Sequence, residues 1–433
     1  MEYTKMETYA MKKPVVRIGF VGLGGRGQGM LELLLTIPGV EVPAVCDRVP
    51  ERAQRGEEIV KQSELYSGYE VRSYVDHREL IKNERLDALM ICTTWISHAR
   101  VAIDGMRAGL HTAMEVGGAA SVEECWQLVR TSEDTGKFCM ILENCCYDRK
   151  EMALYKMVKD GLFGEIVHCE GGYRHDLRDE ISLGRENIHG RLFNFMHRNG
   201  ELYPTHQLGP ICKLLDVNRG NRMLTICSVA SKAAGLNRWN LINKGEDHDL
   251  TRYHFAEGDV VTSIIKCAHG ETILLNHDCC LPRPYSRDYV IQGTKGIFKE
   301  ATERELRFAL EGVTETTHSY EDFGERLPEF EHPLWKWYQT EGVKAGHGGM
   351  DWLVLSAFAE AVKEDAEPPM DVYDTASWMV ITALSEQSAA MGGMPVPIPD
   401  FTNGEWIDRK PFRRGKFCVN AVCDEFFEGE EEQ

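Results

Sequence analysis

The segment Val15–Gly27, VVRIGFVGLGGRG, constrains the fold of this chain more than any other. An apolar, β-rich run leads directly into Gly22, Gly24 and Gly27, which have the spacing G-x-G-x-x-G, and a helix-like segment follows from Met30. Gly22 permits a tight turn, Gly24 lets the backbone approach a pyrophosphate, and Gly27 lets a helix pack closely on the strand. The N-terminus of that helix then faces phosphate groups. The pattern predicts a dinucleotide site rather than a glycine-rich surface turn, with contacts from Gly22, Gly24, Gly25, Arg26 and Gly27.

A carboxylate at the end of the second predicted strand selects the dinucleotide. The apolar run Val40–Cys46 ends at Asp47, which lies 20 residues past Gly27. A carboxylate at this position accepts hydrogen bonds from the adenosine ribose hydroxyls and repels a 2′-phosphate, so Asp47 favours NAD over NADP. The neighbouring Arg48 leaves a phosphate contact open. We predict NAD as the cofactor.

Strands and helices continue to alternate as far as residue 146. Further buried strands are expected at 87–94, 111–116 and 138–143, each followed by a helix or a loop. This alternation predicts an α/β fold with a doubly wound parallel sheet, whose ligands bind beyond the carboxyl ends of the strands. The loops expected at that rim are 22–27, Asp47, 93–98, 115–118 and 143–146.

The pattern changes near Tyr147. Strand-like runs then follow one another without intervening helices, at 165–173, 223–231, 260–267, 272–277 and 289–293. Such an order predicts an α+β domain on a mostly antiparallel, open sheet, with a hairpin after 293 and two apolar helices, near 350–363 and 375–391, that return between the domains. We expect an NAD-binding Rossmann domain at 1–146 and a substrate-binding domain at 147–433 that ends in a solvated acidic tail.

Composition excludes several classes of function. The net charge of −19 disfavours nucleic acid, because phosphate contacts need clustered Lys and Arg. No apolar run approaches the roughly 20 residues that span a bilayer, and the polar segment 1–13 lacks the apolar core of a secretory signal. The 14 cysteines include adjacent pairs but no C-x-x-C, which favours reduced, buried thiols in a cytoplasmic protein and no metal site.

The segment Tyr203-Pro204-Thr205-His206 is the sharpest chemical signal in the second domain. Pro204 restrains the backbone, so a phenol, a hydroxyl and an imidazole project from one short rigid segment. Imidazole titrates near neutral pH and exchanges protons with a sugar hydroxyl or a carbon acid. The structural alternative is a helix N-terminus, in which Thr205 caps residues 207–215 and His206 is merely packed. The residue types alone leave both interpretations open.

Several features together resemble the glucose–fructose oxidoreductase / inositol dehydrogenase family. They are the glycine fingerprint, the Thr93-Thr94 loop, the Met114-Glu115 strand end and the change to an open antiparallel sheet. Many members carry Glu-Lys-Pro where this chain has Glu115-Val116-Gly117, and that lysine serves hydride transfer. Valine holds no proton, which disfavours an ordinary sugar dehydrogenase here.

More specific motifs resemble glycoside hydrolase family 109, the NAD-dependent α-N-acetylgalactosaminidases. These motifs are Trp95-Ile-Ser-His98, Glu115-Val116, Glu143-Asn144, Ile188–Leu192, Tyr203–His206 and Gly346–Asp351. The resemblance implies hydrolysis of a small-molecule glycoside by transient oxidation at carbon 3, elimination, water addition and re-reduction, with NAD recycled in place. The alternatives are an NAD-dependent sugar or polyol dehydrogenase of the same fold and, more remotely, a catalytically silent NAD(H) sensor.

The same resemblance assigns roles to individual residues. It implies catalysis by His206 as a base and Tyr203 as its proton-transfer partner, although sequence does not divide the two roles. It places near the cofactor Trp95, His98, Glu115, Val116 and Asn144, and on the sugar Tyr173, Arg191, Tyr203, Pro204, Thr205, His206 and Tyr285. His175, His189 and His347 are weaker candidates. A homo-oligomer through the open face of the second sheet is also expected.

Overall fold

The computed structural model describes residues 13–344, 346–411, 413 and 415–427, so the segments 1–12 and 428–433, with most of the predicted tail, lie outside it. The N-terminal part forms a six-stranded sheet in the order β3-β2-β1-β4-β5-β6, and every pair in it is parallel. The predicted doubly wound sheet is thereby confirmed. Its strands are β1 (Val16–Val21), β2 (Val40–Cys46), β3 (Arg72–Tyr74), β4 (Ala88–Ile91), β5 (His111–Met114) and β6 (Cys139–Ile141).

Helices cover both faces of this sheet, and its central strands are therefore apolar on both sides. Val16, Ile18 and Phe20 of β1 have no exposed surface. The strands are shorter than the predicted runs at their carboxyl ends, because those residues turn into the rim loops that shape the site. The helices are α1 (Gly25–Leu34), α2 (Pro50–Gln62), α3 (His77–Asn83), α4 (Trp95–Arg107) and α5 (Val122–Thr135).

The second sheet has nine strands in the order β14-β13-β12-β11-β7-β10-β9-β8-β15. It is antiparallel except where β10 runs parallel to β7, and the expected hairpin is present where Gly293 pairs with Gly296. The strands are β7 (Ile166–Arg174), β8 (Met223–Ala230), β9 (Val261–Cys267), β10 (Thr272–Asp278), β11 (Val290–Gly293), β12 (Gly296–Thr302), β13 (Glu305–Leu310), β14 (Glu321–Asp322) and β15 (Val396–Pro397).

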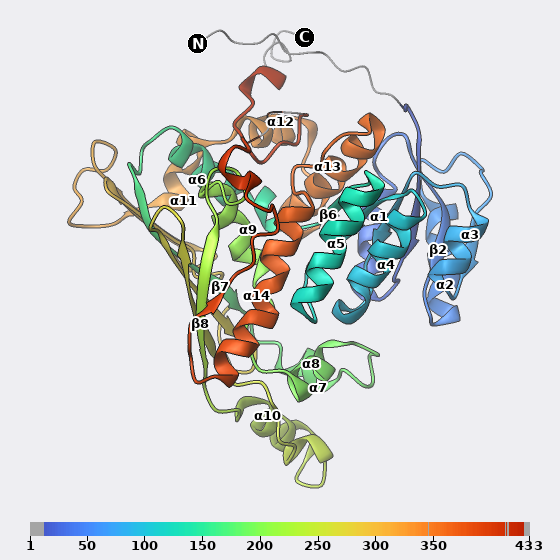
Figure 1. Cartoon of the computed structure of the whole chain (residues 1–433), viewed down its shortest axis with the longest axis horizontal. Helices are drawn as coiled ribbons and strands as arrows, with labels where there is room; N and C mark the ends of the chain where they lie inside the picture. Colours follow the sequence, from blue (N-terminus) through green and yellow to red (C-terminus); the bar gives the residue numbers. More distant parts are fainter. Residues whose placement is uncertain (1–12, 345, 412, 414, 428–433) are drawn as a thin grey trace.

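The helices of this half are mostly short, and several lie at the edge of the fold (Figure 1). None of the described helices is both long and apolar enough to cross a membrane. The helical segments are η1 (Asn144–Tyr147), α6 (Arg149–Lys159), α7 (Arg178–Ser182), α8 (Arg191–His197), α9 (Thr205–Leu214), α10 (Gly235–Lys244), η2 (Asp249–Thr251), α11 (Phe323–Arg326), η3 (Leu327–Phe330), α12 (Pro333–Glu341), η4 (His347–Gly349), α13 (Met350–Glu364), α14 (Val372–Ala390), η5 (Glu405–Ile407) and η6 (Asp424–Phe426).

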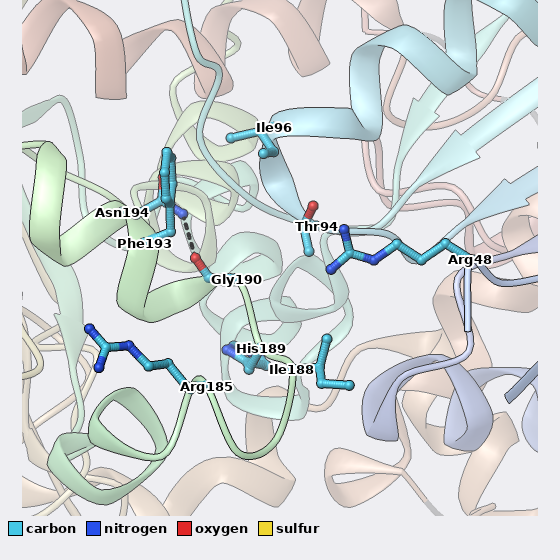
Figure 2. Close-up of a pocket in the computed structure, with 10 residues that line it drawn as sticks. Arg48, Thr94, Ile96, Arg185, Ile188, His189, Gly190, Phe193 and Asn194 are labelled. Atoms are coloured by element: carbon cyan, nitrogen blue, oxygen red, sulfur yellow. Dashed lines mark hydrogen bonds between the residues drawn. The ribbon is translucent and has the colours of Figure 1, made fainter. Parts of the chain in front are cut away.

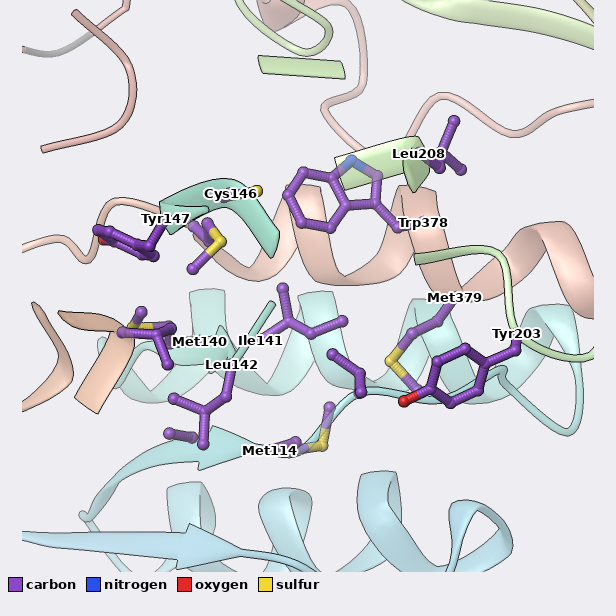
Figure 3. Close-up of a cluster of buried hydrophobic side chains, with 14 of the residues drawn as sticks. Met114, Met140, Ile141, Leu142, Cys146, Tyr147, Tyr203, Leu208, Trp378 and Met379 are labelled. Carbon is purple, nitrogen blue, oxygen red and sulfur yellow. The ribbon is translucent and has the colours of Figure 1, made fainter. Parts of the chain in front are cut away.

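The two long C-terminal helices return to join the halves, as predicted. Helix α14 contacts α5 and β6 of the first half and β8 of the second, and α13 contacts α1 and β1. A helix that is apolar all round must be buried on all sides. Trp378 and Met379 of α14 accordingly have no exposed surface and pack with Ile141, Leu208 and the ring of Tyr203 in one cluster (Figure 3).

Candidate functional site

The glycine loop has the geometry that a dinucleotide requires. Gly22 has a φ of +101°, and a Cβ on Gly27 would lie 2.0 Å from the Gly22 carbonyl oxygen, so neither position accepts another residue without strain. A Cβ on Gly24 or Gly25 would meet no atom of the described residues within 4 Å, which leaves the outer side of the turn open. Helix α1 begins at Gly25, and its free N–H groups suit a pyrophosphate.

Asp47 lies at the carboxyl end of β2 and is 8% exposed. Its Oδ2 accepts a hydrogen bond from the Leu23 N–H at 2.7 Å, and its Oδ1 accepts one from the Val49 N–H at 2.9 Å. These bonds fix the carboxylate beside the glycine loop, while each oxygen keeps a second lone pair for a ribose hydroxyl. The loop and Asp47 together fit NAD.

Arg26 and Asp351 connect the glycine loop to the rest of the site. The Arg26 guanidinium donates to Glu115 Oε1 at 2.8 Å and to both oxygens of Asp351, at 2.6 and 3.0 Å. Asp351 is 1% exposed and also accepts from Asn144 Nδ2 at 2.7 Å. Burial opposes its ionisation, but hydrogen bonds from His347 and Arg26 hold the pKa of Asp351 well below its usual value. A permanent negative charge therefore holds three rim segments together.

An aromatic cluster from both halves of the chain borders this rim. The Tyr203 ring lies 4.4 Å from that of Tyr173 and 5.5 Å from that of Trp95, centroid to centroid. The Arg191 guanidinium carbon lies 5.2 to 5.9 Å from all three ring centroids, and its Nε is 2.9 Å from Glu180 Oε1. The Nη1 of Arg191 is buried and has no hydrogen-bond partner among the described residues, so it is a donor available to a ligand.

His206 is paired with a buried carboxylate. Its Nδ1 lies 2.8 Å from Oε1 of Glu143, which has no exposed surface. Burial would raise the pKa of Glu143, but the charge and hydrogen bond of His206 and the Cys145 N–H lower it below its ordinary value. An ionised carboxylate only accepts, so in the neutral imidazole Nδ1 carries the proton and Nε2 is left to act as a base. This is the arrangement of a base held by an orienting acid.

The Glu143 carboxylate lies close to two other side chains that can bind a metal ion. Ligand atoms of Glu143, Cys145 and His206 lie within 4.8 Å of one another, an arrangement that the sequence prediction of no metal did not foresee. The Arg287 guanidinium, however, has its Nη1 2.8 Å from Cys145 Sγ, and burial raises the pKa of that thiol well above its ordinary value. A fixed cation beside a protonated thiol disfavours metal binding, and the cluster is better suited to proton transfer.

The tyrosines of the site stay protonated at neutral pH. Burial raises the pKa of Tyr173 to about 12, and it also raises the pKa values of Tyr203 and Tyr285 well above their ordinary value. A phenol that does not ionise donates a hydrogen bond or a proton but does not serve as a phenolate base. The Tyr203 and His206 rings lie edge to face at 4.8 Å. Within this pair, His206 is the better base and Tyr203 the better donor.

The other predicted site residues differ in whether they lie in the aromatic cluster or are buried behind the rim loops. The Tyr285 ring centroid lies 6.2 Å from that of Tyr173, and the His175 ring contacts both rings, with its Nδ1 3.1 Å from the Tyr173 hydroxyl. Val116 is buried beside Glu115. His98 is 1% exposed, and its Nε2 bonds the Thr93 carbonyl at 2.8 Å, so any influence on the cofactor passes through that loop.

The alternative interpretation of the Tyr203–His206 segment is partly wrong. Helix α9 begins at Thr205 with Pro204 as its N-cap, and none of the described side chains caps it. Thr205 is itself the first helical residue and is fully buried, so it does not cap residues 207–215. His206 is not merely packed, because it pairs with Glu143. Sequence reasoning gave no role to Glu143, Asp351 or Glu180, although the first two stand in the motifs that it singled out.

The comparisons with known proteins match both halves of the chain. Residues 16–143 match the family described as oxidoreductase family, NAD-binding Rossmann fold, and residues 147–408 match the glycosyl hydrolase 109 C-terminal domain. An alpha-N-acetylgalactosaminidase of Tannerella forsythia is 37% identical over 92% of this chain and 88% of its own length. A glycosyl hydrolase family 109 protein of Stenotrophomonas maltophilia is 39% identical over 92% and 91%, respectively.

Solved structures share the fold at lower identity. An NAD binding oxidoreductase from Klebsiella pneumoniae has a TM-score of 0.69 at 16% identity, covering 90% of this chain and 100% of its own. Levoglucosan dehydrogenase has a TM-score of 0.66 at 19% identity, over 89% and 100%. These likenesses concern the fold alone. The two family matches and the curated relatives show that this chain, whose N-terminal part is an NAD-binding Rossmann domain, belongs to glycosyl hydrolase family 109.

Proposed function

We propose that this chain is an NAD-dependent glycosidase that hydrolyses α-N-acetylgalactosaminides. The observation that carries the proposal is the His206–Glu143 pair, which places an oriented imidazole beside Tyr203, whose ring is also contacted by Arg191. The curated names of relatives that align over nearly the whole chain support the substrate class. The buried Val116, in place of a lysine, argues against a net sugar dehydrogenase.

Different residues of the site accept and donate the protons that move in such a reaction. Bound NAD supplies a reversible hydride acceptor for a sugar C–H bond. His206 Nε2 removes the proton of a sugar hydroxyl or of an acidified carbon, while Glu143 stabilises the resulting imidazolium. Tyr203 donates a proton, because its phenol stays neutral. The unpartnered Nη1 of Arg191 donates to a sugar oxygen that becomes anionic.

A panel of aryl glycosides tests this function. The panel contains α- and β-anomers, with and without the N-acetyl group, and each is assayed without added NAD. We expect release of the aryl alcohol from the α-N-acetylgalactosaminide and no lasting rise in NADH absorbance. Accumulation of NADH in proportion to sugar oxidised would instead establish a dehydrogenase.

Three further expectations extend this proposal. The first is a domain boundary near residue 146, where β6 gives way to η1 and the second half. The second is a homo-oligomer through the outer face of the second sheet, supported by the exposed Val229 and Ile264 on adjacent strands. The third is a cytoplasmic location, supported by the many cysteines, most of which are buried.

A further inference from the structure

A cavity of about 420 Å³ separates the rim of the parallel sheet from a loop of the second half. On the rim side it is lined by Arg48, Thr94 and Ile96, which follow β2 and β4 (Figure 2). On the other side it is lined by the segment 184–190 and the start of α8. Its volume lies within the range of roughly 300–1,000 Å³ found for small-molecule sites.

The position of the cavity relates it to the adenosine end of the dinucleotide. Arg48 directly follows Asp47, whose carboxylate suits the adenosine ribose. Thr94 and Ile96 lie at the start of α4, just after β4, which pairs with β1 beside the glycine loop. A base attached to a ribose at Asp47 therefore has this cavity as its neighbouring space.

The lining suits a flat aromatic base better than a phosphate. Ile96, Ile188 and Phe193 are each about half exposed although they are large and apolar, and all three line the cavity. Arg48 forms no ion pair with the described residues, and a guanidinium plane stacks well on a base. The other cation that lines the cavity, Arg185, is paired with Asp249 at 2.6 Å.

The segment 184–190 is held against the rim by contacts of its own. Arg52 of α2 donates from Nη2 to the Asn187 carbonyl at 3.1 Å. A Cβ on Gly190 would lie 3.0 Å from Thr94 Cγ2, so the loop approaches the rim closely. Ile188 has a φ of +51°, which is unfavourable for a β-branched residue and persists only where surrounding contacts enforce it.

We propose that residues 184–190 form the outer wall of an adenine pocket and retain the dinucleotide between turnovers. Arg48 stacks on one face of the base, and Ile188 covers its exposed side. The inference rests on the proposed function, in which the same NAD must receive and return the hydride within one cycle. A wall from the substrate-binding half slows the release of NAD and NADH alike.

Dissociation of bound NADH, followed by its fluorescence after dilution into excess NAD, tests the wall. Arg52→Ala removes the tether, and Ile188→Asn replaces the apolar cover with a residue that tolerates the same φ. We expect each to release NADH about tenfold faster, the effect of one lost contact of moderate strength. The matched control is Arg55→Ala, on the same helix but paired with Glu58 at 3.0 Å, and it should release NADH at the native rate.

AMP and nicotinamide mononucleotide, the two halves of NAD, show which end of the cofactor each variant affects. AMP should bind Ile188→Asn and Arg48→Ala more weakly than native protein, while nicotinamide mononucleotide should bind all three equally. If Arg52→Ala and Ile188→Asn released NADH at the native rate, the proposed wall would be wrong but the proposed function would stand. The same conclusion would follow if the variants bound AMP and nicotinamide mononucleotide with equally reduced affinity. Tighter binding of NADP than NAD would overturn the adenine assignment in favour of a phosphate site at Arg48. Native protein that binds no NAD(H) would overturn the proposed function as well.

Discussion

Oε1 of Glu143 and Nδ1 of His206 lie 2.8 Å apart, although the two residues are separated by 63 positions in the chain. Glu143 follows β6 of the first sheet, whereas His206 lies in the first turn of α9 in the second half. The bond therefore assembles the base only when the two halves are folded together. It also fixes the imidazole tautomer, which makes the carboxylate a positioning residue for the base.

Glu143→Gln should remove the negative charge beside His206 while still orienting its imidazole. The amide can still accept a hydrogen bond but no longer stabilises an imidazolium, so we expect kcat to fall about 10²-fold or more. Retention of NAD should be unchanged. The matched control is Glu170→Gln, because Glu170 pairs with His168 at 3.5 Å on the outer face of the second sheet. A similar loss of kcat in both variants would contradict the role given to Glu143.

Tyr203→Phe removes a hydroxyl but keeps the ring that packs against Trp95 and Tyr173. We expect a roughly 10²-fold loss of kcat with KM nearly unchanged, because a proton donor acts mainly in the transition state. His206→Ala should lose the full 10²–10⁴-fold of a general base. Tyr253→Phe, on a ring outside the site, is the control. A rise in KM with native kcat would show that Tyr203 only binds the sugar.

Asp351→Asn tests the junction between the glycine loop and the catalytic rim. The change removes the charge that pairs with Arg26 and weakens a buried network, at a cost of about 1–3 kcal/mol in unfolding free energy. Urea unfolding measures that cost, and calorimetry should show weaker NAD binding. Asp247→Asn, at an exposed position, should behave as native. Native NAD affinity in Asp351→Asn would show that the network is dispensable for the cofactor.

Stability should decline below neutral pH because of a buried histidine. Burial lowers the pKa of His98 to about 4, against roughly 6.5 in the unfolded chain. The unfolded state binds the extra proton between these values, so stability is fully present above pH 6.5 and is lost as the pH falls towards 4. The shift in the pKa of His98 alone accounts for a loss of about 3 kcal/mol in the free energy of unfolding. His98→Gln should flatten the dependence of the unfolding free energy on pH, and an unchanged slope would exclude His98 as the source.

The sequence predicted the cofactor half well because its signals are local. The glycine spacing and Asp47 lie within one βαβ unit, and their structural roles follow from neighbouring residues. The contacts that complete the site are not local. Asn144 and Asp351 bond across 207 positions, and only the return of α13 to the first sheet brings them together. The same reason explains why Glu143 had no predicted role.

The small elements of the second half were also beyond sequence reasoning. Helices α7 and α8 have five and seven residues, too few for a helical period to be recognised. Helix α8 nevertheless carries Arg191 and lines the cavity beside Arg48, and α7 carries Glu180, which pairs with Arg191. Family resemblance implied that Arg191 contacts the sugar, which stays a prediction, and it gave no information about the partner of Arg191, Glu180.

The most direct test of the account is the isotope content of the product. Native protein should hydrolyse an aryl α-N-acetylgalactosaminide in D₂O, and mass spectrometry with proton NMR should locate deuterium in the released sugar. The elimination route removes the proton at carbon 2 and replaces it from solvent, so the NAD-assisted mechanism predicts one deuterium at that carbon. A product that carries none there, formed at the native rate, would contradict the NAD-assisted mechanism for this protein.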